Sequence, residues 1–176
     1  MTNQYLSKWK NEKKLINLSL KTKLSIIDQN SLTNRLMYKD KHGFTVNVLN
    51  QECRYLNQSM KCNLPNKVTG IGVYRKVILS TNYYPKIEAY TFMLIKHVSG
   101  KERFLKILGA RSLGIYILNP RRFKKKSIVY KRVGRSIHRI SIYNYRYKNI
   151  YLNEIFPDTI EFENISYLNA RGKFTK

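Results

Sequence analysis

The chain has 176 residues, of which 43% are hydrophobic and 12% aromatic, and this composition excludes a protein that is disordered throughout. Its 34 basic and 10 acidic residues give a net charge of +24, which favours partners that carry negative charge. The abundance of Lys, Asn, Ile, Tyr and Phe is also typical of an AT-rich genome, and that bias explains the charge equally well.

Hydrophobic periodicity predicts helices and strands in an order typical of an α+β domain. A helix is expected over residues 28–41, capped by Asp28 or Asn30 and ended by Gly43. Two short helices around a glycine turn are expected over 101–118. Patterns typical of strands occupy residues 44–48, 72–80, 87–97, 127–132, 136–144 and 147–156.

These elements predict an α+β fold with a single domain, a mainly antiparallel β-sheet of about six strands with helices packed on one face. A long loop is expected over 57–72. We expect the domain to cover residues 24–157. A polar N-terminal extension, 1–23, would precede it, and a loosely packed C-terminal tail, 158–176, would follow it.

Several classes of protein and site are not expected. No run approaches 18 apolar residues, so no membrane span is predicted, and the polar, lysine-rich residues 1–14 do not resemble a secretory signal. Cys53 and Cys62 are too few for a disulfide framework and lack the spacing of a zinc site. The three histidines are scattered along the chain and lack the spacing of metal ligands, so we expect no metal site.

Two charged side chains fall on apolar strand faces. Alternation over residues 73–79 places Arg75 with aliphatic side chains, and alternation over 150–156 places Glu154 with apolar ones. Burying either charge alone costs several kcal/mol, roughly. Either Arg75 and Glu154 form a buried ion pair with no further role, or both line a cavity. In the second case, Arg75 binds an anionic ligand and Glu154 binds a polar group on it.

The chain resembles the chorismate lyase (chorismate–pyruvate lyase) family at these residues. The block YRKVIL, residues 74–79, is similar to the family's LREILL strand, and IYLNEIFP, residues 150–157, is similar to its LLLTELFLP. Five blocks occur in the family's order with similar gaps, at residues 26–33, 74–79, 89–93, 108–114 and 150–157. The chain also resembles plastid-encoded chorismate-lyase-like proteins, which implies the plastid stroma as its location, or otherwise the cytoplasm.

The resemblance implies roles for four residues. Arg75 matches the family's ligand-contacting arginine and Glu154 its functional glutamate. Leu113 matches a leucine whose backbone contacts ligand, and Leu32 replaces a methionine at the start of a helix and keeps an apolar wall. The chain departs from the family's prolines where it carries Ser112 and, at the end of the hairpin, Leu94.

The implied reaction is the loss of pyruvate from chorismate to give 4-hydroxybenzoate, a quinone ring precursor, by a monomer without a cofactor. Arg75 would hold a substrate carboxylate, and Glu154 would accept the hydrogen bond of the C4 hydroxyl or act as a base on it. The N–H of Leu113 would help to bind carboxylate, and Leu32 would shield the ring from water.

Two alternatives remain open. The basic run 121–126 and the Arg- and Tyr-rich segment 130–147 are also typical of an RNA- or ribosome-associated protein, in which aromatic rings stack on bases. The same fold could instead serve as a non-catalytic domain that binds a small anion. Salt-dependent retention on RNA without turnover of chorismate would favour the first alternative.

Overall fold

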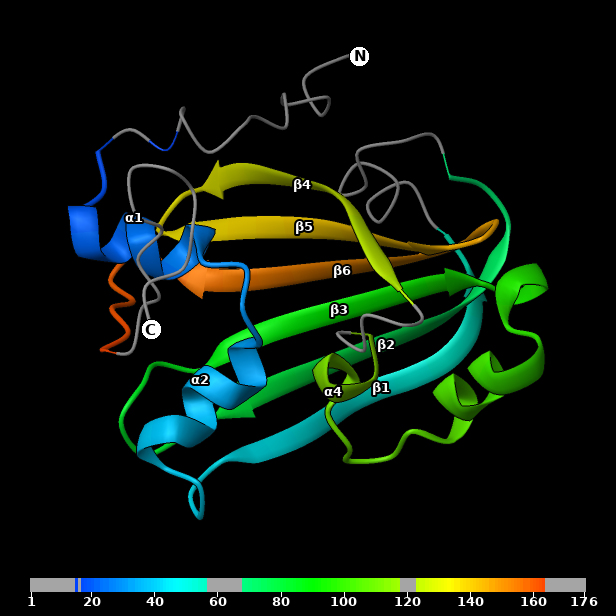
Figure 1. The fold of residues 1–176 in the computed structure, drawn as a ribbon, viewed down its shortest axis with the longest axis horizontal. Coiled ribbons are helices and arrows are strands. Elements are labelled where there is room, and N and C mark those ends of the chain that lie inside the picture. Colours follow the sequence, from blue (N-terminus) through cyan, green and yellow to red (C-terminus); the bar gives the residue numbers. More distant parts are fainter. Residues whose placement is uncertain (1–14, 16, 57–67, 118–122, 164–176) are drawn as a thin grey trace.

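Six strands form one antiparallel sheet in the computed structural model of the chain, which describes residues 15, 17–56, 68–117 and 123–163. The strands follow the order β1-β2-β3-β6-β5-β4 (Figure 1). They are β1 (Thr45–Tyr55), β2 (Ile71–Ser80), β3 (Ile87–Leu94), β4 (Lys124–Val133), β5 (Ser136–Tyr145) and β6 (Lys148–Pro157). The prediction of about six antiparallel strands is confirmed. Most of the loop predicted over 57–72 lies outside the described residues.

The helices lie on one face of this sheet, as the sequence predicts. Three α-helices, α1 (Leu20–Ile27), α2 (Leu32–Lys39) and α4 (Leu113–Ile117), stand in front of the sheet in Figure 1. Two 3-10 helices, η2 (Ile95–His97) and η3 (Gly100–Ile107), follow β3. The two short helices expected over 101–118 are therefore η3 and α4, and Gly109 between them adopts a φ of 56°.

The prediction of a helix over 28–41 is wrong at the N-terminal end of that range. Asp28 ends α1 instead of capping α2, and its carboxylate accepts the backbone N–H of Asn30 at 2.9 Å. Ser31 caps α2, because its Oγ accepts the N–H of the third helical residue at 3.2 Å. Short polar side chains that bond to nearby backbone break the helical run here.

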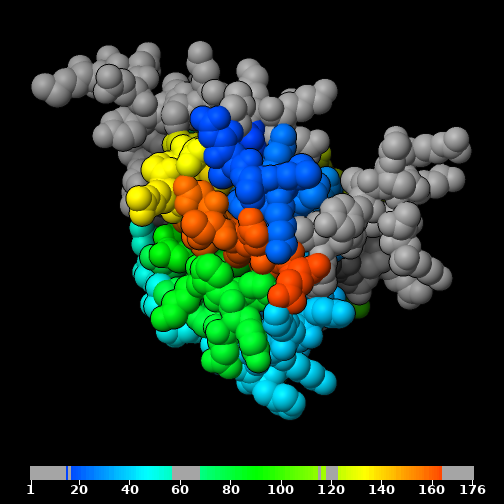
Figure 2. Space-filling view, turned by 90° about the vertical axis from the view of Figure 1, so that its left-hand side faces the viewer, coloured from blue at the N-terminus to red at the C-terminus, as the bar shows by residue number. Residues whose placement is uncertain are grey.

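The packed domain extends beyond both expected boundaries. α1 begins inside the expected extension, 1–23, of which residues 1–14 and 16 lie outside the described residues. At the other end, Ile160 and Phe162 are fully buried, so the described part of the expected tail, 158–176, packs tightly. The N–H of Phe162 donates to the Ser25 hydroxyl at 2.8 Å. Figure 2 shows α1 and the segment after β6 side by side on one face of the molecule.

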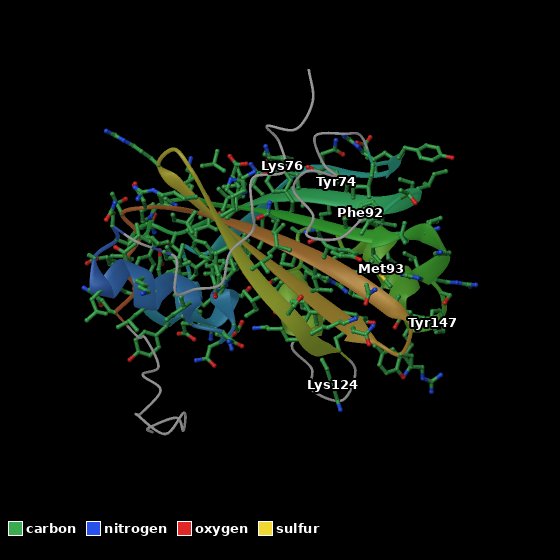
Figure 3. All side chains as sticks on the ribbon, turned by 90° about the horizontal axis from the view of Figure 1, so that it is seen from above. Tyr74, Lys76, Phe92, Met93, Lys124 and Tyr147 are labelled. Atoms are coloured by element: carbon green, nitrogen blue, oxygen red, sulfur yellow. The ribbon has the colours of Figure 1, made fainter. Side chains whose placement is uncertain are left out.

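The two faces of the sheet have different environments. Figure 3 shows Tyr74, Lys76 and Phe92 on the face turned away from the helices. The opposite face is built from the alternate residues, among them Val73, and packs against α1, α2 and α4 through two apolar clusters. Three charged residues of that second face, Arg75, Arg139 and Glu154, are buried.

Candidate functional site

Arg75 and Glu154 both point toward the helices, from strands that are separated only by β3. Arg75 lies opposite Thr91 of β3, and Glu154 lies opposite Ala89, two residues earlier on that strand. Standard strand spacing and rise per residue then put their Cα atoms roughly 12 Å apart. Both line one cavity whose empty volume is about 620 Å³ when the open solvent at its mouth is included. The structure thus places both predicted residues around one hollow.

Arg75 is 4% exposed, and its guanidinium is held only by neutral groups among the described residues. Its Nη1 donates to the side-chain oxygen of Gln51 at 2.5 Å, and its Nη2 donates to the main-chain oxygen of Arg111 at 3.2 Å. No carboxylate of the described chain lies within ion-pair distance, and desolvation lowers the pKa of Arg75. A buried cation with neutral partners is an energetically favourable place for an anionic ligand.

Glu154 has a different environment, because it pairs with a second buried arginine. Arg139 donates from Nε to the Glu154 carboxylate at 2.8 Å, and the two side chains are 5% and 8% exposed. The alternative of a buried ion pair between Arg75 and Glu154 is therefore wrong. Glu154 remains part of the cavity wall, where it offers a hydrogen-bond acceptor held in place by Arg139.

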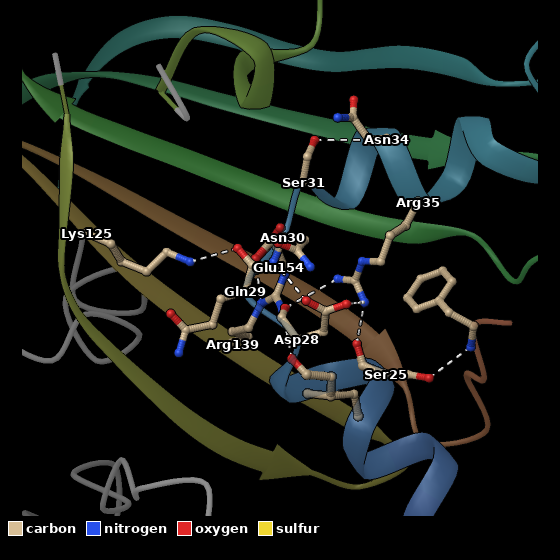
Figure 4. Close-up of polar contacts among 12 residues, drawn as sticks. Ser25, Asp28, Gln29, Asn30, Ser31, Asn34, Arg35, Lys125, Arg139 and Glu154 are labelled. Atoms are coloured by element: carbon tan, nitrogen blue, oxygen red, sulfur yellow. Dashed lines mark hydrogen bonds and ion pairs between the residues drawn. The ribbon is translucent and has the colours of Figure 1, made fainter. Parts of the chain in front are cut away.

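Arg139 also joins the sheet to the segment between α1 and α2, as Figure 4 shows. Its Nη1 donates to the main-chain oxygens of Ile26 and Asp28, at 2.7 and 2.6 Å. Arg35 of α2 binds the main-chain oxygen of Ser25 at 2.7 Å and lies 3.6 Å from the Asp28 carboxylate. Burial and the nearby Arg139 charge lower the pKa of Arg35 to about 10. This polar network fixes the start of α2 over the cavity.

Arg139 was not predicted from the sequence. Alternation over β5 is uninformative because both of its faces are apolar, one through Ile137 and the other through Ile140 and Ile142. Alternation therefore did not single out the Arg139 charge on one apolar face of β5. Only the pairing of β5 with β6 shows that Arg139 lies directly opposite Glu154.

The two predicted apolar residues, Leu32 and Leu113, lie in the roof of the cavity. Leu32 is the first residue of α2 and Leu113 the first of α4; both are buried and both line the cavity. The roof is tied together by a hydrogen bond of 2.6 Å between the hydroxyls of Thr33 and Ser112. The structure therefore brings all four predicted site residues around the same hollow.

The lining of the cavity is strongly cationic. Its charged side chains are Arg75, Arg111, Lys125, Arg139 and Glu154. Lys125 donates from Nζ to the main-chain oxygen of Gln29 at 3.1 Å, and burial together with the Arg139 charge lowers its pKa to about 8. In the sequence, Lys125 stands out only as part of the basic run 121–126. A wall with four cations and one carboxylate favours a ligand with more than one negative charge.

Two further observations concern the described residues only. They contain no group of three or more His, Cys, Asp and Glu side chains arranged to hold a metal ion. None of their helices has the length and apolar character needed to cross a membrane.

Comparisons with known proteins point to one family. A family model described as chorismate lyase matches residues 4–160. No curated protein matches the chain. Among solved structures, the chain is similar to a transcriptional regulator of the GntR family from Bacillus cereus, with 14% sequence identity and a TM-score of 0.47. That match covers 71% of this chain and 99% of the other.

Proposed function

The chain belongs to the chorismate lyase family, and we propose that it eliminates pyruvate from chorismate to leave 4-hydroxybenzoate. One observation carries the proposal. The buried Arg75 guanidinium, with no carboxylate partner among the described residues, faces a cavity whose opposite side presents the Glu154 carboxylate. This arrangement suits a small ring that carries a carboxylate at one end and a hydroxyl at the other.

The reaction needs positioning more than activation. The ether bond between C3 and the enolpyruvyl oxygen breaks, and the hydrogen on C4 moves to the methylene carbon of the departing group. The ring becomes aromatic and pyruvate leaves, so all atoms and electrons are accounted for without an oxidant, a reductant or water. Holding a reactive conformer is worth at most about 7–11 kcal/mol in favourable cases.

The charged residues have complementary roles in this proposal. Arg75 binds the ring carboxylate through charge-assisted hydrogen bonds, with its orientation set by Gln51 and the Arg111 carbonyl. Glu154 accepts the hydrogen bond of the C4 hydroxyl, at the opposite end of the ring. Arg139 holds Glu154 in place and is a positioning residue.

The roof residues exclude water from this ring. Leu32 covers the ring from α2, and the main-chain N–H of Leu113 donates to the ring carboxylate beside Arg75. The bond between Thr33 and Ser112 keeps the two roof elements together. Water exclusion strengthens each electrostatic contact inside the cavity.

The direct test is incubation of the purified protein with chorismate, with 4-hydroxybenzoate measured by chromatography and pyruvate by a coupled reduction. Equimolar products that disappear in Arg75→Met are expected. Lys76→Met is the matched control. It removes the cation next to Arg75 in the chain, and the Lys76 side chain points away from the cavity (Figure 3). Intact chorismate together with salt-dependent retention on RNA would contradict the proposal and favour a nucleic-acid-binding protein.

A further inference from the structure

Chorismate carries two carboxylates, whereas the roles proposed above engage one carboxylate and the C4 hydroxyl. A binding site for the second carboxylate is therefore required only if chorismate is the substrate, as in the proposed function. A carboxylate that enters a cavity without a cation or donor of its own is strongly disfavoured. The enolpyruvyl group is attached at C3, next to the hydroxyl, so its carboxylate must lie at the Glu154 end of the cavity and not at the Arg75 end.

Two lining cations are poor candidates for this second carboxylate. Arg139 already binds the Glu154 carboxylate and two main-chain carbonyls. Arg111 has an exposed side chain, and its carbonyl contacts Arg75, which places it at the other end of the cavity. Among the charged lining residues of the described chain, Lys125 is then the cation at the Glu154 end.

Lys125 lies on the far side of Glu154 from Arg75. The strand order places Arg75 on β2, Glu154 on β6 and Lys125 on the edge strand β4. Four strand spacings, roughly 19 Å, separate β2 from β4, and two long side chains extend into the cavity between them. The three groups therefore occur in the order of the ring carboxylate, the C4 hydroxyl and the enolpyruvyl carboxylate of the substrate.

Local structure turns Lys125 toward the cavity. It lies opposite Tyr143 of β5, with its Nζ 5.6 Å from the centre of that ring, and a β-bulge follows between Lys125 and Ser127. Figure 4 shows its amino group reaching the main-chain oxygen of Gln29 above the Glu154 and Arg139 pair. An ammonium has three N–H donors, so one carbonyl does not saturate it.

We propose that Lys125 binds the enolpyruvyl carboxylate. It thereby distinguishes ligands with a second carboxylate on an ether side chain from 4-hydroxybenzoate, which has a single carboxylate. The recognised chemistry is a second carboxylate joined through an ether bond next to the ring hydroxyl. The same assignment favours release of 4-hydroxybenzoate, since this product has lost the carboxylate that binds Lys125.

The charges around Lys125 support this role. Arg139 of β5 and Arg35 of α2 disfavour its charged form, whereas Glu154 of β6 and Asp28 at the end of α1 favour it. Burial is the largest effect, and the resulting pKa is about 8. A carboxylate bound beside the ammonium would offset both the burial and the repulsion from the two arginines.

The test compares the binding of two stable ligands by calorimetry, so that it does not depend on turnover. The probes are 4-hydroxybenzoate and 3-(carboxymethoxy)-4-hydroxybenzoate, which adds an ether-linked carboxylate beside the hydroxyl. We expect the wild type to bind the dicarboxylate about 10- to 100-fold more tightly, as for a charge-assisted bond. Lys125→Met should abolish this preference and leave the affinity for 4-hydroxybenzoate within about twofold.

Lys124→Met is the matched control, because it removes the neighbouring exposed cation, which points outward in Figure 3. It should keep the preference. A preference that survives in Lys125→Met, or that is lost in Arg111→Met instead, would overturn the assignment. If wild-type protein shows the preference but does not convert chorismate, the lyase proposal fails while the assignment of Lys125 stands.

The pH dependence gives a second readout. Lys125 is charged below its pKa of about 8, so the preference for the dicarboxylate should weaken as the pH rises from 7 to 9. Lys125→Arg carries a charge that does not titrate in this range and should keep the preference at pH 9. An equal decline in both proteins would contradict the assignment.

Discussion

Two buried guanidinium groups on the same sheet face have opposite environments. Arg75 and Arg139 are equally buried, at 4% exposure each, and both line the cavity. Arg139 is matched by the Glu154 carboxylate and by two carbonyls from the end of α1. Arg75 is held by one amide oxygen and one carbonyl, with its charge unmatched among the described residues.

The contrast shows that burial alone does not identify a ligand-binding charge. A buried charge with an opposite charge against it has its desolvation compensated within the protein, so it contributes to the framework. A buried charge held only by neutral dipoles is oriented but not neutralised, so it remains available to an anion. Arg139 fits the first description and Arg75 the second, and the variants below test that difference.

The largest effect is expected from Arg139→Met. The variant leaves the Glu154 carboxylate buried without its cation, so the free energy of unfolding should fall by about 3–5 kcal/mol. Urea denaturation followed by circular dichroism measures this loss. Arg75→Met is the matched control and should change the free energy by less than about 1 kcal/mol, because it removes a charge that the protein does not neutralise. Equal losses in the two variants would contradict the contrast.

Arg75→Met should produce the next largest effect, on ligand binding. Loss of the charge-assisted hydrogen bonds should weaken the affinity for 4-hydroxybenzoate about 100-fold. Calorimetric titration of the folded variant measures this change. Arg75→Lys keeps the charge but loses the bidentate geometry, so it should recover only part of the affinity. An unchanged affinity in Arg75→Met would remove Arg75 from the site.

Glu154→Gln should affect turnover more than affinity. The amide keeps the size of the side chain but replaces the charged acceptor for the C4 hydroxyl, so kcat should fall about 10- to 100-fold. The KM for chorismate should stay within about threefold. Steady-state kinetics measure kcat and KM, on protein that circular dichroism shows to be folded. A rise in KM with an unchanged kcat would assign Glu154 to binding alone.

The smallest effect is expected from Gln51→Leu, which acts on Arg75 indirectly. Gln51 holds the guanidinium and donates to the main-chain oxygens of Leu105 and Lys106 of η3. Loss of one such hydrogen bond should weaken 4-hydroxybenzoate binding about 3- to 10-fold. Glu52→Gln, on the opposite face of β1, is the control and should not change the affinity.

The strand patterns and two of the charged site residues could be read directly from the sequence. In β2 the apolar face is interrupted only by Arg75, and over residues 150–156 of β6 only by Glu154, so alternation alone points both charges inward. The cap of α2 was harder to predict, because Asp28, Asn30 and Ser31 are all good caps and only the fold shows which one begins the helix. The burial of Phe162 was also missed, because its short, acidic surroundings resemble a tail.

The amino-acid sequence by itself determined the six-stranded α+β fold and the inward charges of Arg75 and Glu154, because side-chain alternation is a local property of each strand. Only the tertiary structure decided which charges neutralise one another. The partners of Glu154 and Lys125, namely Arg139 and the Gln29 carbonyl, come from other elements of the fold. Ion pairing depends on distance in space, so strand order and the placement of α1 and α2 had to be known first.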